Sequence, residues 1–590
     1  MIAGSTRLPG SPIQPLTDSQ LEARWVARMA RRSGRAFAAW TIQSCAALLS
    51  GGLVAAAFPP VAQPWLLLVA FVPLLRAVEM RPVGRAIWLG WITGLTACGA
   101  AFHWILPTVV RFHELSSFQA ALCFFGFVAL NALPFALFAG GAALISWGVS
   151  VSLLAPLEMS GGWALASLWT FLEWFYPKLL PWQLGDAFAS SPILRQSADL
   201  FGVYGLSYFI ILVNGWLAAA IAADLPRPRR LRTAGSAVGL VGTVIVYGQM
   251  CFTFDSPLER PLTVAVIQKG PDGVSDFAQA NEDAWVTYSR LTEDVVARQR
   301  ARELNQSAAY DRVGLVIWPE TALRADLAGN RLYRDRLEQL VNRLQIPLLV
   351  GGLSPADEDR ERNSAFLFNL EPLEVQSFLL TRRLDKLQTY SKQRLVPFGE
   401  YTPGADWSDS LRALRTTGRF VPGEQINSLW LNKQVALAPS ICFESLWPGF
   451  FLDYVVDGAG LLVNLSDDSW FDDDSEATLH LNAAILRAVE MRRWAVRASG
   501  SGISAIIDAH GNVIDALPLK ATGALRRTVG IRSDLSLYAY VGNAVVVFAF
   551  ANLIWFCLRI RSETYYVRKE RERQLAAALW QIGPATRAIP

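Results

Sequence analysis

The sequence predicts a polytopic α-helical membrane domain joined to a water-soluble α/β domain. The chain has 590 residues, of which 52% are hydrophobic and only 18% charged, and its mean hydropathy is +0.28. A soluble domain has about 25% charged residues. Residues 36–256 carry almost no charge, whereas residues 257–535 have the composition of a globular domain. We therefore expect a membrane part and a soluble part in one chain.

Eight apolar runs are long enough to cross the roughly 30 Å of hydrocarbon in a bilayer. They lie near residues 36–57, 64–80, 86–110, 117–148, 160–177, 200–223, 234–254 and 537–558. One arginine cluster precedes the first run, and others follow the second, sixth and eighth runs. If each run crosses the membrane once, all four clusters lie on the same side of it. Because Lys and Arg favour the cytoplasmic side, we expect both termini in the cytoplasm and the globular domain outside it.

The expected organisation has five parts. They are a basic cytoplasmic segment (1–35), a membrane domain with about seven transmembrane helices (36–256), an extracytoplasmic domain (257–535), a final transmembrane helix (536–558) and a basic cytoplasmic tail (559–590).

Composition also excludes several classes of partner and site. A net charge of +4, without a basic patch interleaved with aromatic residues, argues against nucleic-acid binding. Of the six cysteines, only Cys442 lies in the globular part, which excludes a disulfide within that domain and a metal site built on paired cysteines. The acidic run 472–474 lacks the spacing of a calcium loop. We expect no metal and no cofactor.

In the globular part, short β-branched runs alternate with helical stretches. We predict strands at 263–267, 313–318, 347–351, 435–442, 460–464 and 503–509, and helices at 281–304, 331–344 and 478–497. The last strand is followed by a predicted turn at 510–512 that leads into Val513. Strands that alternate with helices indicate an α/β or layered α-β-β-α domain.

Three segments place a reactive side chain directly after a predicted strand or loop. They end in Glu320, in Lys392 with Glu400 eight residues later, and in Cys442 with Glu444. A carboxylate can take the proton of a thiol, and a lysine can stabilise developing negative charge.

Each of these residues also has an ordinary structural interpretation. A single cysteine is most often a small buried hydrophobe, Glu320 alone could cap a helix, and Lys392 alone could be a solvated charge. The globular part has only two histidines, His480 and His510, so a Cys-His mechanism has few candidates. With only 7 Lys against 47 Arg in the chain, a lysine at such a place carries more weight.

At these residues the sequence resembles the nitrilase (carbon–nitrogen hydrolase) superfamily and, with its flanking spans, the membrane-bound apolipoprotein N-acyltransferase family within it. The resemblance covers roughly residues 40–558. Its motifs are Val316-Ile317-Trp318-Pro319-Glu320-Thr321, the run from Lys392 to Pro403, Ile441-Cys442-Phe443-Glu444, Asp468-Ser469-Trp470-Phe471, His480 with Arg487-Ala488-Val489-Glu490, and Gly502-Ile503-Ser504.

The resemblance implies a nitrilase-like four-layer α-β-β-α sandwich and a role for each matching residue. Glu320 would be the general base, Lys392 the stabiliser of the tetrahedral intermediate and Cys442 the nucleophile. Glu400 and Glu444 would support them, with a purely structural role equally open for both. The positions that would line the substrate pocket are Trp318, Asn363, Phe443 and Trp470.

The sequence also departs from the pattern of the family. It has Asp467-Asp468-Ser469 where Asn-Asp-Ala is common, and Gln268-Lys269-Gly270 where Gln-Gly-Asn is common. These changes surround the pocket, so they bear on substrate preference more than on the chemistry.

The implied activity is transfer of a fatty acyl chain from a membrane phospholipid, through a Cys442 thioester, to the α-amine of the diacylglyceryl-cysteine of an apolipoprotein. The implied location is the bacterial inner membrane, with the catalytic domain on the periplasmic side. One alternative is a membrane-tethered amidase that hydrolyses a soluble amide with the same residues. Another is a membrane assembly or transport factor without activity.

Overall fold

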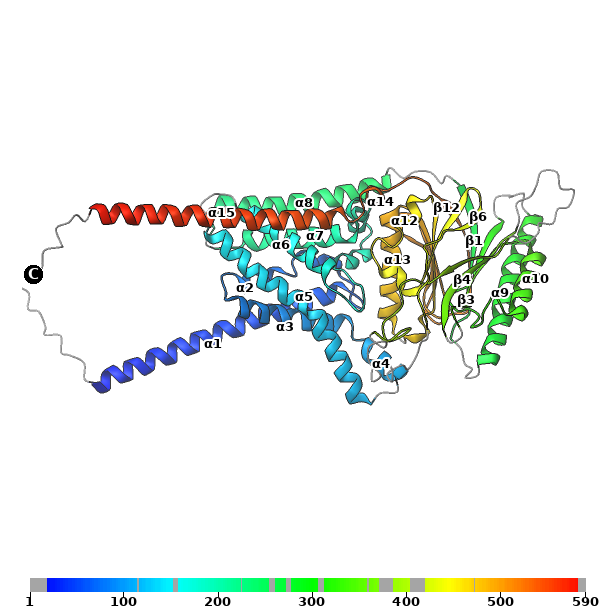
Figure 1. The fold of residues 1–590 in the computed structure, drawn as a ribbon, viewed down its shortest axis with the longest axis horizontal. Coiled ribbons are helices and arrows are strands. Elements are labelled where there is room, and N and C mark those ends of the chain that lie inside the picture. The colour runs from blue at the N-terminus through cyan, green and yellow to red at the C-terminus, as the bar shows by residue number, and fades with distance from the viewer. Residues whose placement is uncertain are drawn as a thin grey trace, which may run out of the picture.

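The computed structural model describes residues 18–581 except 114–115, 152–156, 224, 254–259, 272–276, 306–311, 358–359, 371–385, 404–419 and 472. The molecule is elongated, with a helical bundle at one end and two β-sheets flanked by helices at the other (Figure 1). The first described helix and the last one both project from the end of the bundle away from the sheets. Both ends of the described chain therefore lie opposite the sheets.

In the part of the chain that the structure describes, the bundle has nine α-helices and three short 3-10 helices. The α-helices are α1 (Asp18–Ala57), α2 (Val72–Val78), α3 (Val83–Ala101), α4 (Ile105–His113), α5 (Ser117–Val151), α6 (Leu157–Phe175), α7 (Ala198–Ala220), α8 (Arg227–Thr253) and α15 (Ala544–Gln581); the 3-10 helices are η1 (Pro64–Leu68), η2 (Leu184–Ser190) and η3 (Leu194–Ser197).

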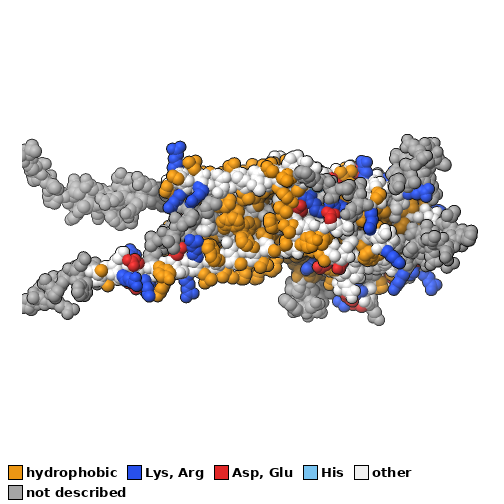
Figure 2. All heavy atoms as spheres, turned by 90° about the horizontal axis from the view of Figure 1, so that it is seen from above, with side chains coloured by type: hydrophobic (Ala, Val, Ile, Leu, Met, Phe, Trp, Pro, Cys, Tyr) orange, Lys and Arg blue, Asp and Glu red, His pale blue; other side chains and the backbone are white. Residues whose placement is uncertain are grey.

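Among the described residues, five helical stretches are long and apolar enough to cross a membrane. They are Ala38–Ala57, Ser117–Gly148, Leu194–Ala220, Arg227–Thr253 and Ala544–Ala577. Figure 2 shows hydrophobic side chains covering the side of the bundle, with basic side chains at the end from which α1 and α15 project. Such a band is what a surface in contact with lipid requires. A membrane domain is therefore confirmed, while the number of eight spans and the five domain boundaries stay predictions.

The second apolar run does not form one continuous helix. It is divided into η1 and α2, with a turn between them. The amides freed by the break are satisfied inside the bundle: Asn214 accepts from the backbone N of Phe71 (2.8 Å), and Ser50 from that of Leu74 (2.9 Å). Irregular backbone is tolerated at membrane depth where protein groups satisfy it.

The last apolar run is also interrupted. Residues Leu537–Val541 form the short helix α14, and Gly542 follows with φ 54°. This left-handed conformation favours glycine and ends α14 before the apolar helix α15 begins at Ala544. The apolar helix α15 thus begins at Ala544, while the bound of 536 for the final span stays a prediction.

The described residues of the second part of the chain form two six-stranded sheets. One has the order β12-β1-β2-β3-β4-β5 and the other the order β11-β10-β9-β8-β7-β6. The strands are β1 (Arg260–Gln268), β2 (Val313–Ile317), β3 (Leu348–Pro355), β4 (Glu361–Phe368), β5 (Gln388–Ser391), β6 (Leu429–Asn432), β7 (Val435–Ile441), β8 (Leu461–Ser466), β9 (Trp494–Ser499), β10 (Ser504–Ile507), β11 (Val513–Leu517) and β12 (Gly523–Ile531).

Helices cover the outer faces of both sheets. Helices α9 (Phe277–Asn305) and α10 (Arg331–Leu344) lie at the end of the molecule far from the bundle, and α12 (Leu452–Val456) and α13 (Asp474–Met491) lie between the second sheet and the bundle (Figure 1). The predicted four-layer α-β-β-α sandwich is confirmed.

Most predicted elements are present, but one boundary is wrong. The helix predicted for 478–497 ends at Met491, and residues 494–499 form β9 instead. Arg492 adopts the left-handed conformation with φ 50°, which ends the helix without the glycine that usually marks such a site. Strands β4, β5, β6, β9 and β12 were not predicted.

The bundle and the sandwich are joined by buried polar contacts. Gly202 interrupts α7 with φ 65°, and the backbone N of Val203 donates to Glu490 Oε1 on α13 (2.8 Å). One turn earlier, Asp199 Oδ2 lies 2.7 Å from Arg492 Nη2. The break in α7 thus provides the amide that α13 binds.

Candidate active site

Glu320 follows β2, and its side chain is held from three sides. Oε1 accepts from Asn363 Nδ2 (2.6 Å) and lies 3.3 Å from Lys392 Nζ, and Oε2 accepts from the backbone N of Asp467 (2.7 Å). The carboxylate is buried, with 7% of the residue exposed. Its orientation is therefore fixed by neighbours from both sheets.

Lys392 follows β5, which belongs to the same sheet as β2. The order β2-β3-β4-β5 in this sheet places Lys392 beside Glu320. β2 and β3 are parallel, and β3, β4 and β5 are successively antiparallel. The carboxyl ends of β2 and β5 therefore point to the same edge of the sheet. Lys392 Nζ donates to Glu400 Oε1 at 2.8 Å, and Glu400 Oε2 accepts from the backbone N of Val396.

Cys442 follows β7 in the other sheet, at the first residue of the 3-10 helix η5 (Cys442–Leu446). Its φ is 51°, a conformation that costs a residue with a side chain about 1–3 kcal/mol and is found mostly at functional sites. The backbone oxygen of Cys442 accepts from Asn464 Nδ2 on β8 (3.3 Å) and from Ser445 Oγ (3.1 Å). The strained turn is thus held in place by its neighbours.

Glu444 connects the turn at Cys442 to the loop that follows Lys392. Oε2 accepts from the backbone N of Ile441 (2.7 Å), and Oε1 accepts from that of Gln393 (2.6 Å) and that of Arg394 (3.1 Å). Tyr390 OH, at the end of β5, lies 2.8 Å from both oxygens. Glu444 is fully buried and has no further oxygen to offer a substrate, so its role is to fix Cys442 relative to Lys392.

The electrostatics of Glu320, Lys392 and Cys442 suit proton transfer from the thiol. Burial raises the pKa of Glu320 to about 7, while Lys392 works against this rise. Burial also raises the pKa of the Cys442 thiol well above its usual value, with Glu320 adding to the rise and Lys392 opposing it. Burial opposes the charge on Lys392, but Glu320 and Glu400 outweigh it and raise the pKa of the ammonium well above its usual value. A neutral thiol, a base near pH 7 and a fixed cation therefore meet here.

A second polar cluster adjoins the thiol. Atoms of Cys442, Asp468 and His480 lie within 4.8 Å of one another. Asp468 is paired at 2.6 Å with the buried Arg497. Burial alone would raise the pKa of the Asp468 carboxyl, but the charge of Arg497 outweighs burial and holds this pKa well below its usual range. Because this guanidinium already neutralises Asp468, the cluster is better described as a structural ion pair than as a metal site.

The residues expected to line the pocket have different placements. Trp318 is buried against α9: its ring stacks on Tyr288, and its Nε1 donates to Thr292 Oγ1 (3.0 Å). These contacts place the ring against α9, and a role for Trp318 in lining the substrate pocket stays a prediction. Asn363 holds Glu320 and lies 3.5 Å from Glu400 Oε1.

Phe443 and Trp470 are the other two residues expected to line the pocket. Phe443 is buried, with its ring edge toward Trp447. The side chain of Trp470 lies outside the described residues. Pocket-lining roles for Phe443 and Trp470 therefore stay predictions, as do the catalytic roles of Glu320, Lys392 and Cys442.

Two family models match the chain over its two parts. Residues 50–216 match the N-terminal domain of apolipoprotein N-acyltransferase, and residues 263–533 match carbon-nitrogen hydrolase. An apolipoprotein N-acyltransferase from Bdellovibrio bacteriovorus is 30% identical over 497 residues, which cover 80% of this chain and 85% of that one. The chain belongs to the apolipoprotein N-acyltransferase family.

Another apolipoprotein N-acyltransferase, from Geobacter metallireducens, is also 30% identical, over 86% of this chain and 92% of its own. Among solved structures, an amidase from Nesterenkonia sp. is 16% identical with a TM-score of 0.32, over 49% of this chain and 96% of that one. The predicted family is confirmed, and with its apolar helices the chain is a bacterial membrane protein.

Two residues beside the candidate site are not predicted from the sequence as part of it. Tyr390 lies two residues before Lys392, but its bond to Glu444 depends on the approach of two sheets. Arg497 lies at the end of the segment for which a helix is predicted. An arginine within the otherwise apolar run 494–499 is the signal that could have indicated a buried ion pair.

Proposed function

We propose that the chain is an apolipoprotein N-acyltransferase that moves a fatty acyl group from a membrane phospholipid, through a thioester on Cys442, to the α-amine of a diacylglyceryl-cysteine. Phospholipids and lipoproteins are its substrates in general terms. The single observation that carries the proposal is the buried arrangement of Glu320, Lys392 and Cys442 in a chain of this family.

In the first half-reaction, Glu320 takes the proton of Cys442 and the thiolate attacks an ester carbonyl of the phospholipid. Lys392 Nζ stabilises the negative charge that develops on the carbonyl oxygen. The ester C–O bond then breaks, the proton passes from Glu320 to the leaving oxygen, and a lysophospholipid departs. The product is a thioester on Cys442.

In the second half-reaction, the amine of the acceptor attacks the thioester carbonyl. The C–N bond forms and the C–S bond breaks, and Glu320 passes the amine proton to the sulfur of Cys442. This restores the thiol and releases an N-acylated lipoprotein. Both halves use the same base and the same cation.

The membrane helices give a physical reason for acyl transfer over hydrolysis. They hold the site close to a bilayer that contains both lipid substrates, which raises their effective concentration. A site bordered by apolar helices also limits the access of water to the thioester. We further propose that the sandwich lies on the periplasmic side of the inner membrane and that both termini are cytoplasmic, as the arginine clusters predict.

The test uses purified full-length protein in detergent and a phospholipid with a labelled acyl chain. The protein should acquire label that hydroxylamine removes, and Cys442→Ala should acquire none. If the wild type never acquires label but hydrolyses a soluble amide, the chain is a tethered amidase. If it does neither, the chain has no activity of this class.

A further inference from the structure

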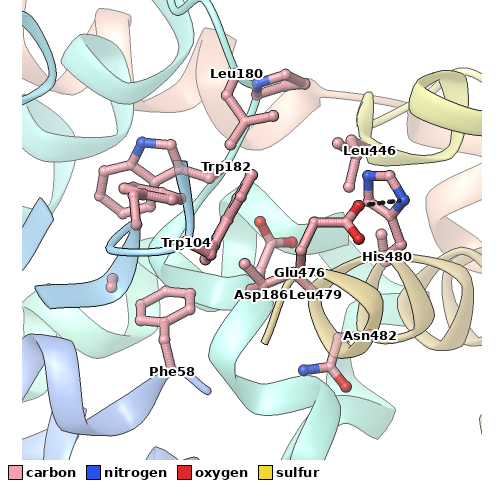
Figure 3. Close-up of a pocket in the computed structure, with 14 residues that line it drawn as sticks. Phe58, Trp104, Leu180, Trp182, Asp186, Leu446, Glu476, Leu479, His480 and Asn482 are labelled. Carbon is pink, nitrogen blue, oxygen red and sulfur yellow. Dashed lines mark ion pairs between the residues drawn. The ribbon is translucent and has the colours of Figure 1, made fainter. Parts of the chain in front are cut away.

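A pocket lies where the helical bundle meets α13, next to the nucleophile turn. The space between its lining atoms, including the part open to solvent, is about 530 Å³. The bundle contributes an aromatic wall and α13 the opposite wall (Figure 3). The aromatic residues are Phe58, Phe102, Trp104 and Trp182. Such a wall is suited to hydrocarbon chains.

Two acidic side chains are among the polar groups of this pocket. Asp186 of η2 and Glu476 of α13 line it, and no Lys or Arg is among the described residues that do so. Glu476 is 1% exposed, and its Oε2 has no hydrogen-bond partner in the described part of the chain. A buried carboxyl oxygen without a partner is unfavourable unless a ligand supplies one.

His480 connects this carboxyl to the thiol. Its Nδ1 lies 3.0 Å from Glu476 Oε1, and a ring nitrogen lies within 4.8 Å of Cys442 Sγ. Figure 3 shows Glu476 between Asp186 and His480, at the α13 side of the pocket. A group bound to Glu476 is therefore about one imidazole ring away from the reacting sulfur.

The chemistry of the pocket selects between the two lipid substrates. The phosphate and ester oxygens of a phospholipid donor accept hydrogen bonds, and the phosphate is negatively charged, so two acidic side chains do not complement them. A lipid-modified N-terminus instead offers an amine, which donates hydrogen bonds and is protonated near neutral pH. The amine must also come within about 3–3.5 Å of the thioester carbonyl to react.

We propose that this pocket is the acceptor subsite, in which Glu476, positioned by His480, binds the α-amine of the lipid-modified N-terminus. The inference rests on the proposed function and deepens it. The acyl chains of the acceptor then lie along the aromatic wall, toward the bundle.

The proton balance follows from the state of the carboxyl. Burial, together with the charges of Asp468 and Asp473, raises the pKa of Glu476 well above its usual value, although Arg497 opposes this. The incoming ammonium pairs with the carboxylate. The carboxylate then takes one proton from the ammonium, and the free amine attacks the thioester. When the product leaves, the carboxyl gives this proton to the solvent. Each amide formed thus releases one proton.

The experiment separates the two half-reactions. Full-length protein is first loaded with a labelled acyl chain from phosphatidylglycerol, which has no amine, and is then given a peptide with an N-terminal diacylglyceryl-cysteine. Glu476→Gln should load with label, but the peptide concentration that half-saturates transfer should rise by roughly tenfold or more, as expected for losing a hydrogen bond to a charged group.

Three controls keep the result specific. Asp474→Asn, an exposed carboxylate on the same helix, should leave loading and transfer unchanged. Hydroxylamine should discharge the wild-type and E476Q thioesters at equal rates, because it does not need the pocket. Leu479→Trp, which narrows the pocket without touching the carboxyl, should also raise the half-saturating peptide concentration.

The outcomes are distinguishable. If E476Q and L479W transfer acyl groups to the peptide with the wild-type concentration dependence, the acceptor subsite is disproved while the thioester mechanism stands. If E476Q instead loads more slowly from phosphatidylethanolamine alone, the pocket binds the donor head group and the inference is also overturned. If the wild type never loads, the proposed function itself fails.

Discussion

Asn363 Nδ2 donates a hydrogen bond of 2.6 Å to Glu320 Oε1, and both side chains are buried. The bond stabilises the charged form of Glu320 and so lowers its pKa, against the rise that burial causes. The amide of one strand thus tunes the base that follows another strand.

The first prediction concerns pH. A general base must be deprotonated, so the kcat/KM for loading Cys442 should rise as pH increases through about 7, the value to which burial raises the pKa of Glu320. Asn363→Ala removes a hydrogen bond to the charged form, so this limb should move to higher pH. The exposed Asn342→Ala is the control. If kcat/KM of N363A rises over the same pH range as that of the wild type, Asn363 does not lower the pKa of Glu320.

The second prediction concerns Lys392, whose positive charge opposes the rise in the pKa of the Cys442 thiol. Lys392→Met should raise that pKa further, and the rate of alkylation by iodoacetamide at a fixed pH should fall. Loading from phospholipid should slow by on the order of 10² or more, because the oxyanion loses its donor. Equal rates of loading in K392M and wild type would contradict the assignment.

The third prediction tests whether Glu444 holds two loops together. Glu444→Gln replaces one acceptor oxygen by an NH₂ group that faces backbone N–H donors. The free energy of unfolding should fall by about 1–3 kcal/mol, and loading should slow with it. Tyr390→Phe removes only one hydroxyl, so its loss should be smaller, about 1 kcal/mol. Thermal unfolding in detergent orders the variants, and a larger loss in Y390F would contradict this role.

Much of the sandwich could be predicted because its local signals agree with its tertiary structure. The helix Arg331–Leu344 is predicted and observed with the same bounds, and it begins at Asn330, whose side chain accepts from the backbone N of Leu332. Strand β5 has only four residues, Gln388–Ser391, of which one is buried, so neither its length nor its composition marks it as a strand. Its place in the sheet comes from pairing with β4.

In the candidate site, too, some features follow from local sequence and others only from tertiary contacts. Glu320 and Cys442 each stand at the end of a predicted strand, whereas Lys392 follows β5, which is not predicted. The bond between Tyr390 and Glu444 joins residues of different sheets, and no local pattern predicts which residues of two sheets will meet. The turn at Arg492 could not be predicted because a left-handed arginine is uncommon.

The fourth prediction concerns the close packing behind Glu320. A Cβ atom on Gly351 of β3 would lie 2.3 Å from the backbone oxygen of Pro319 and 2.6 Å from Glu320 Cα. Gly351→Ala should therefore shift the Glu320 loop, destabilise the protein by about 1–3 kcal/mol and slow loading. The control is Gly239→Ala in α8, where a Cβ would meet nothing within 4 Å. If G351A loaded at the wild-type rate, the base would not depend on this packing.

The last prediction concerns the junction between the bundle and the sandwich. Asp199 at the start of α7 and Arg492 after α13 form an ion pair of 2.7 Å, and each residue is 8% exposed. Asp199→Asn leaves the guanidinium buried with a weaker partner, so the free energy of unfolding should fall by about 3 kcal/mol. Glu570→Gln, which breaks the exposed pair with Arg573, should have no measurable effect. Helix α13 carries Glu476 and His480, so the loss of this ion pair should also raise the acceptor concentration that half-saturates transfer. If D199N is less stable but has the wild-type half-saturating concentration, the pocket does not depend on this contact.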